Sequence, residues 1–359
     1  MAFLKVSNVA IRGISACVPP EVEENKDISF YAPGEAEQVI ASTGIERRHL
    51  AGPDICVSEL CTAAAEKLLE SIGWEQDSID ALVLCTQNPD YHNQPTSFLV
   101  HERLGLPDST MCLDFFHGCP GWVTSLGGAS RLVSNQGIKR VLLLVGDTVS
   151  KDQNMGSRES RPLFGDCCTA TALEFCEGAP AMYFNYGTFS DGGKALILTQ
   201  GGYRNPYNHE TLEIELQRRA GTLPQGEGDD MDGMDVFSFA ITKVPKILKK
   251  LCAEFELDQE SVDHLVLHQA NKLIVDAIAK RMKMPADKVP LGLREYGNTT
   301  SASIPLTIVS ECGKEYSSGH QKSLVCGFGT GLSVAAAYIE TDKIVCPKVI
   351  IYKNKEKNV

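Results

Sequence analysis

The sequence lacks the features that mark membrane, secreted and nucleic-acid-binding proteins. Its longest apolar runs, such as "VLLLV" at 141–145, are far shorter than a membrane span. A total of 34 basic residues against 46 acidic ones gives a formal charge of −12, which argues against an extended nucleic-acid surface. We therefore expect a cytoplasmic protein that binds neither a membrane nor nucleic acid.

Paired cysteines are also missing. The 13 cysteines include no C-x-x-C pair, so neither a disulfide framework nor a zinc ribbon is indicated. Cys112, His117 and Cys119 are close in sequence, but their spacing matches no recognised zinc pattern and we expect no metal there. At 359 residues and 43% hydrophobic content, the chain is long enough for two packed domains.

What the chain does contain is an internal repeat. The stretch "EQDSIDALVLCTQ" at 75–87 matches "DQESVDHLVLHQA" at 258–270, an offset of 183 residues. Buried apolar runs alternate with helical patterns, which predicts βαβ units in an α/β fold. We expect two similar halves, 1–177 and 178–359, with the active site at their junction. The predicted strands are 80–85, 111–116, 139–146, 168–176, 180–189, 263–267, 323–326 and 333–339.

A strand, a turn and a helix surround one cysteine in "LDFFHGCPGW", residues 113–122. Apolar residues recur at helical spacing after Pro120, and this helix is predicted to stop at Gly137. Cys119 is then at a helix N-terminus, where the helix dipole is expected to lower the pKa of its thiol and to favour a nucleophile. The alternative is that Cys119 is a small buried apolar residue.

Two stretches of the second half support the catalytic interpretation. "HLVLHQANKLI" places His268 at the end of a strand, where the sites of α/β proteins gather. "REYGNTTSASIP" places Asn298 in a loop before a helix that starts near Pro305. Each residue alone could be structural, His268 as a hydrogen-bonded histidine and Asn298 as a turn former. Their combination with the cysteine favours a shared site.

The charged segment 201–235 interrupts this regular pattern. Its "DDMDGMD" does not fit a calcium loop, because Gly228 would fall at the first ligand position and Phe239 at the last. The segment is either a surface excursion or a cap over the substrate.

Together, these motifs resemble those of the thiolase-like condensing enzymes, and within them the 3-oxoacyl-ACP synthase III family. The resemblance covers nearly the whole chain. Besides the turn at Cys119, the matching motifs are "STGIERRHL" (42–50), "RPLFGD" (161–166), "MDGMDVFSFA" (231–240), "HQAN" (268–271), "YGNTTSASIP" (296–305) and "GFGTGLS" (327–333).

The resemblance implies an α/β fold of the thiolase-like duplicated kind, five-layered (αβαβα) with two central mixed sheets and usually homodimeric. It implies a Cys119, His268 and Asn298 triad, with an oxyanion hole formed by the backbone N–H groups of Cys119 and Thr330. Its implied activity is decarboxylative Claisen condensation of an acyl thioester with malonyl-ACP in fatty acid biosynthesis. No cofactor is implied beyond CoA or acyl-carrier-protein thioesters as substrates. The implied substrate-binding positions are Gln94, Phe328, Gly329 and Gly331.

Several positions depart from the family pattern. Gln38 and Ser42 replace the Trp and Arg that handle CoA, Gln94 replaces a Phe, and Ser238 and Leu273 replace basic residues linked to carrier-protein docking. Docking of an acidic acyl carrier protein to this acidic chain needs local positive charge. The expected docking residues are Lys249, Lys250 and Lys272, with Lys246, Lys280, Arg281 and Lys283 as further candidates.

These departures leave other functions open. A specialised relative could use the same triad for secondary lipid or polyketide-type products, or for acyl transfer without decarboxylation. A hydroxymethylglutaryl-type synthase is disfavoured because its glutamate acid/base has no evident counterpart in the sequence. A non-catalytic acyl-carrier or scaffold protein is opposed by the complete triad.

Overall fold

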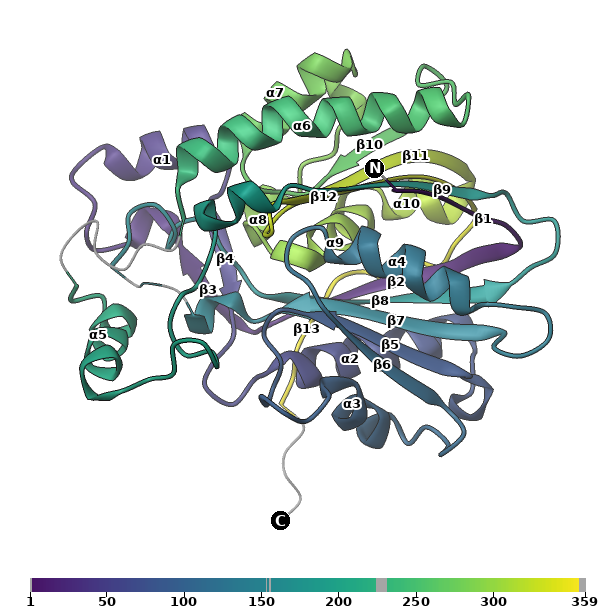
Figure 1. Cartoon of the computed structure of the whole chain (residues 1–359), viewed down its shortest axis with the longest axis horizontal. Coiled ribbons are helices and arrows are strands. Elements are labelled where there is room, and N and C mark those ends of the chain that lie inside the picture. The colour runs from purple at the N-terminus through teal and green to yellow at the C-terminus, as the bar shows by residue number, and fades with distance from the viewer. Residues whose placement is uncertain (1, 153, 155, 224–230, 355–359) are drawn as a thin grey trace.

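Two mixed sheets form the centre of the protein, with helices between them and on both outer sides (Figure 1). The computed structural model describes residues 2–152, 154, 156–223 and 231–354. The first sheet has the order β13-β2-β8-β7-β5-β6 and the second the order β1-β9-β12-β11-β10. The strands of the first sheet are β2 Val9–Val18, β5 Ala81–Thr86, β6 Met111–Phe116, β7 Arg140–Asp147, β8 Cys167–Phe175 and β13 Ile350–Ile351. Those of the second are β1 Ala2–Val6, β9 Met182–Thr188, β10 His264–Leu267, β11 His320–Gly329 and β12 Ser333–Asp342.

The two sheets repeat one topology. In the first, β5 runs parallel to β7, and β8 and β2 follow as antiparallel neighbours. In the second, β10 runs parallel to β11, and β12 and β9 follow in the same way. The repeated sequences 75–87 and 258–270 include β5 and β10, which hold equivalent places. Residues 2–6 nevertheless join the second sheet, and residues 350–351 join the first. Each predicted half therefore contributes one outer strand to the sheet of the other half.

Five layers result from how the helices cover the sheets. Apolar faces of α2 and α3 pack on the outer side of the first sheet, and those of α6 and α7 on the outer side of the second. Helices α4 and α9 lie between the sheets, where both inner faces contribute to one apolar core. The helix bounds are α2 Val57–Ile72, α3 Thr96–Leu104, α4 Gly121–Leu132, α6 Gly233–Glu254, α7 Lys272–Met282 and α9 Ser303–Glu311.

The remaining strands and α-helices complete the described chain. They are the antiparallel pair β3 Glu21–Glu24 and β4 Arg47–Leu50, and the helices α1 Glu35–Thr43, α5 His209–Ala220, α8 Leu293–Tyr296 and α10 Gly313–Ser318. Helix α5, from the charged segment 201–235, lies at the side of the molecule (Figure 1). Residues 224–230 of that segment, which include part of "DDMDGMD", lie outside the described residues. No helix in the described ranges is long and apolar enough to cross a membrane.

Candidate active site

The cysteine stands at a sharp turn between β6 and α4. Strand β6 ends at Phe116, and the N–H of Gly121 closes the turn by donating to the carbonyl of Gly118 at 2.7 Å. Pro120 is the N-cap of α4, one position earlier than a first helical residue. The helix ends at Leu132 rather than at the predicted Gly137, because the next residue is extended and a short turn follows.

The "GFGTG" segment lies directly against this turn. A Cβ on Gly329 would be 2.8 Å from both Cβ and Sγ of Cys119, so a side chain at position 329 would occupy the space of the Cys119 side chain. One residue further on, the backbone and hydroxyl of Thr330 favour the thiolate of Cys119, as does the backbone of Cys119 itself, and these groups lower the pKa of the thiol. The two backbone groups expected to form the oxyanion hole therefore both act on the charge of the sulfur.

His268 follows the end of β10 and is almost fully buried. Its backbone N–H donates to the carbonyl of Cys326 at 2.9 Å, which extends the parallel pairing by one residue. Its ring packs edge-on against Phe328, with centroids 5.2 Å apart, and its Nδ1 lies 2.7 Å from the hydroxyl of Ser303. Helix α7 starts beyond it with Asn271 as N-cap.

Asn298 is fixed through its backbone. Its N–H donates to the carbonyl of Leu163 at 2.8 Å, and its carbonyl accepts from the N–H of Gly165 at 3.1 Å. The side-chain Oδ1 accepts from the N–H of Thr300 at 2.9 Å. Because this acceptor is occupied, the NH₂ group of Asn298 is the part of the amide left to donate to a ligand.

A buried arginine holds the loop that clamps Asn298. Arg48, from the "STGIERRHL" motif, is fully buried and pairs with Glu23. It also donates to the carbonyls of Arg161 and Phe164, which belong to the "RPLFGD" motif. The two motifs therefore act together to hold the backbone around position 298 in place.

Burial sets the protonation states of both titratable members of the triad. It raises the pKa of the Cys119 thiol to about 11, with a further increase from the charge of Asp147. The expected lowering by the helix N-terminus is therefore wrong for the ligand-free protein, because loss of hydration opposes the thiolate more than the nearby N–H groups favour it. Burial lowers the pKa of His268 to about 3, so its imidazole is neutral at physiological pH.

Contacts bring the predicted triad into one place. Cys119 touches the end of β11, and His268 packs against Phe328 of the same strand. His268 and Asn298 are joined through the 300–303 turn, because Ser303 contacts His268 and Thr300 contacts Asn298. The helix after this turn starts at Ser303, two residues before the predicted Pro305.

The other predicted positions are more scattered. Gly331 lies in the turn between β11 and β12, against Ser333, and its carbonyl lies next to Gly193. Gln94 is exposed in the loop before α3. Lys249 and Lys250 are exposed on α6, whereas Lys272 pairs with Asp276 one helical turn away.

Sequence reasoning missed two residues of the site, Ser303 and Asp147. Asp147 ends β7 and is buried; its carboxylate accepts from the hydroxyls of Thr86, Thr300 and Ser301 and from the backbone N–H groups of Gln87 and Ser301. It thus ties the first sheet to the turn after Asn298. The only available signal was a carboxylate directly after the buried run "VLLLVG".

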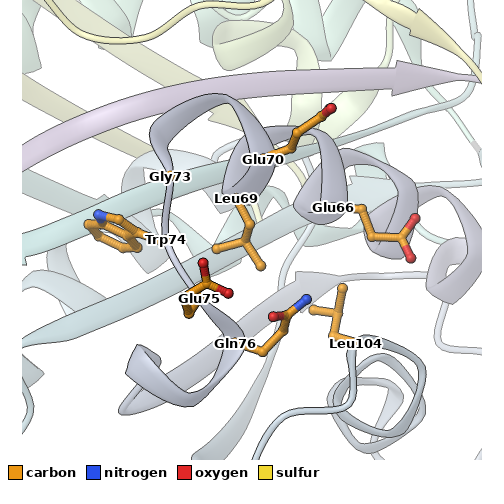
Figure 2. Close-up of a pocket in the computed structure, with 8 residues that line it drawn as sticks. All are labelled: Glu66, Leu69, Glu70, Gly73, Trp74, Glu75, Gln76 and Leu104. Carbon is orange, nitrogen blue, oxygen red and sulfur yellow. The ribbon is translucent and has the colours of Figure 1, made fainter.

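Two other features lie apart from the triad. Cys56, Glu59 and Asp90 group as metal-ligand types do within the described residues, but Cys56 and Glu59 cap α2, and Arg103 and Lys151 already contact them. A pocket at the end of α2 is lined by Glu66, Glu70, Gly73, Glu75, Gln76 and other residues (Figure 2). It opens on the outer side of the first sheet, whereas Cys119 packs against Gly329 at the end of β11 in the second sheet.

A duplicated α/β fold with a buried cysteine, histidine and asparagine between its sheets defines the thiolase-like class of condensing enzymes. Family models place the chain more narrowly. The model "3-Oxoacyl-[acyl-carrier-protein (ACP)] synthase III" matches residues 113–188, and the model of the C-terminal part of the same family matches residues 252–341.

Comparisons with individual proteins indicate the same family. The chain is 33% identical over 341 residues to a beta-ketoacyl-[acyl-carrier-protein] synthase III of Synechococcus sp. (strain RCC307), covering 94% of this chain and 99% of that protein. A crystal structure of a 3-oxoacyl-(acyl-carrier protein) synthase from Burkholderia xenovorans LB400 matches with a TM-score of 0.88 and 35% identity, over 97% of this chain and 98% of that one. The chain belongs to the 3-oxoacyl-ACP synthase III family, whose members are acyltransferases.

Proposed function

We propose that this chain condenses an acyl thioester with malonyl-ACP to give 3-oxoacyl-ACP through an acyl-Cys119 intermediate, in fatty acid biosynthesis. The observation that carries the proposal is the contact set around the sulfur. The backbone groups of Cys119 and Thr330 favour the Cys119 thiolate, Cys119 packs against Gly329 at the end of β11, and neutral His268 packs against Phe328 of the same strand. Family membership supports the reaction class.

The first half-reaction is acyl transfer to the sulfur. The Cys119 Sγ attacks the carbonyl carbon of the acyl thioester, and its proton ends on the thiol of the departing CoA or carrier protein. The negative charge on the thioester oxygen is stabilised by the backbone N–H groups of Cys119 and Thr330. Because the pKa of the free thiol is about 11, these donors act chiefly when charge forms on the sulfur or the oxygen.

The second half-reaction uses the other two residues. A malonyl thioester loses its carboxylate as CO₂, and the electron pair of the broken bond forms an enolate on the thioester. A neutral imidazole of His268 and the NH₂ group of Asn298 donate hydrogen bonds to the enolate oxygen. The enolate carbon then attacks the acyl-Cys119 carbonyl, and the Cys119 thiolate leaves.

Delivery and assembly are part of the same proposal. Exposed Lys249 and Lys250 supply positive charge for docking of an acidic carrier protein. A homodimer is supported by β6, which is the outer strand of its sheet and carries Phe116 with 78% of its surface exposed. We propose that the enzyme works in the cytoplasm with CoA or carrier-protein thioesters and no other cofactor.

Product analysis tests the proposal. Malonyl-carrier-protein and a panel of acyl-CoA donors are incubated with the enzyme, and the carrier protein is weighed by mass spectrometry while released CO₂ is measured. We expect a 3-oxoacyl carrier protein and one CO₂ for each condensation. Transfer of the acyl group to the carrier protein without CO₂ release would instead support a family member that transfers acyl groups without decarboxylation.

A further inference from the structure

Three polar residues lie next to one another at the edge of the first sheet, close to the catalytic cysteine. Strands β6, β5 and β7 are parallel neighbours, and continuing their register past the last observed pairs, by one residue for β6 and two for β7, places His117, Gln87 and Asp147 side by side at the carboxyl edge of the first sheet. The odd-numbered residues before them on these strands pack into the core between the sheets. By strand alternation, all three side chains therefore start toward the layer that contains Cys119.

Asp147 has no capacity left for a ligand. Its two oxygens accept from Thr86, Thr300 and Ser301 and from the backbone of Gln87, so it is a fixed, buried and fully hydrogen-bonded carboxylate. It orders Gln87 through this backbone bond. Its negative charge also makes the neighbourhood unfavourable for a second carboxylate.

Gln87 and His117 are different, because their side chains have no hydrogen-bond partner in the part of the chain that the structure describes. Both are half-buried. A Cβ on Gly118 would be 2.5 Å from Oε1 of Gln87 and 2.7 Å from the hydroxyl of Thr330, so the Gln87 amide reaches the residue next to Cys119. Burial lowers the pKa of His117, and the charge of Asp147 only partly offsets this, so His117 offers a neutral ring.

We propose that Gln87 and His117 bind an uncharged oxygen on the acyl group that Cys119 carries, so that hydroxyacyl or oxoacyl thioesters are preferred over plain alkyl ones. This inference rests on the proposed function and adds a substrate class to it. A plain alkyl chain would strip water from the two polar groups and give nothing in return, which typically costs about 1–3 kcal/mol for each. A hydroxyl or keto oxygen on the first carbons beyond the thioester can accept from either residue.

The test compares donors of similar size. Butyryl-CoA, 3-hydroxybutyryl-CoA and succinyl-CoA are each mixed with the enzyme, and the rate of Cys119 acylation is followed by intact-protein mass. We expect 3-hydroxybutyryl-CoA to react about ten-fold or more faster than butyryl-CoA, because at least one polar group that the acyl chain covers gains a partner. Succinyl-CoA is expected to be slow because of Asp147.

Matched variants assign the preference to its residues. Gln87→Leu and His117→Phe replace the polar groups by apolar ones of similar size, and each is expected to reduce or invert the preference. Gln76→Leu, on the outer side of the first sheet, is the control and is expected to keep it. Melting temperatures show whether each variant is folded, and the wild-type preference alone is decisive if a variant is not.

The outcomes separate this inference from the function on which it rests. Equal or faster acylation by butyryl-CoA in the wild type would overturn the substrate class and leave the condensing activity intact. A preference that persists in both Gln87→Leu and His117→Phe would also overturn it. No acylation by any donor, in a folded protein, would contradict the proposed function itself.

Discussion

Nδ1 of His268 lies 2.7 Å from the hydroxyl oxygen of Ser303, and that same oxygen lies 2.8 Å from the carbonyl of Thr300. A hydroxyl has one proton, so Ser303 can donate to only one of them. When it donates to Nδ1, the imidazole proton is on Nε2 and is available to an enolate. When it donates to Thr300, the proton is on Nδ1. Ser303 therefore couples the tautomer of His268 to its own orientation.

Ser303→Ala tests this coupling. Without the hydroxyl, no group donates to Nδ1, and the tautomer that donates from Nε2 loses its support. We expect malonyl decarboxylation to fall about ten-fold or more, since a lost buried hydrogen bond costs roughly 1–3 kcal/mol. Acylation of Cys119 should change little, and Ser303→Thr, which keeps a hydroxyl, should restore most of the decarboxylation. An equal loss in both half-reactions would point to general damage instead.

Gly329 is predicted to tolerate no side chain. In Gly329→Ala the new Cβ would be 2.8 Å from Cβ and Sγ of Cys119, at a backbone φ of +150° that L residues rarely adopt. We expect a loss of about 1–3 kcal/mol in the free energy of unfolding and little or no Cys119 acylation. Gly319→Ala is the matched control, because nothing lies within 4 Å of its added Cβ. Wild-type acylation by Gly329→Ala would contradict this packing.

The reactivity of the free thiol should depend steeply on pH. A thiol pKa of about 11 predicts that alkylation of Cys119 by iodoacetamide rises about ten-fold per pH unit from pH 7 to pH 10, without a plateau. Since Asp147 contributes to the raised pKa, Asp147→Asn should shift the rate profile to lower pH. Asp108→Asn, at an exposed position, is the control. A plateau near pH 7 in the wild type would instead indicate a preformed thiolate.

The lysines of α6 should matter only for the carrier protein. Reversing Lys249 and Lys250 to Glu is expected to raise KM for malonyl-carrier-protein several-fold and to leave KM for malonyl-CoA unchanged, because only the carrier protein presents an acidic surface. Lys26→Glu with Lys314→Glu makes the same charge change at exposed positions elsewhere. Equal KM values for both double variants, measured at one ionic strength, would remove Lys249 and Lys250 from the docking surface.

Sequence patterns predicted the strands and the elements that carry the triad, because apolar periodicity and the 183-residue repeat are local signals. They did not predict the exchange of β1 and β13 between the sheets, since strand pairing at a distance leaves no local pattern. They also gave the wrong direction for the pKa of Cys119. Position at a helix N-terminus can be read from sequence, whereas burial between two sheets follows only from the packing.

The partners of the triad were missed for a similar reason. Ser303 and Asp147 act through contacts between segments far apart in the chain, with 35 residues separating Ser303 from His268 and 154 separating Asp147 from Ser301. Nothing in the local sequence distinguishes Ser303 from its neighbours. The sequence likewise did not predict that "RPLFGD" holds Asn298, because this role depends on the backbone hydrogen bonds of Asn298 with Leu163 and Gly165.

The central claim is that Cys119 carries the acyl group, and intact-protein mass tests it most directly. The wild type, Cys119→Ser and a Cys85→Ser control are incubated with acyl-CoA and acyl-carrier-protein donors and then weighed. We predict a mass gain of one acyl group in the wild type and in Cys85→Ser, and no mass gain in Cys119→Ser. An adduct that persists in folded Cys119→Ser, or no adduct from any donor, would contradict the account.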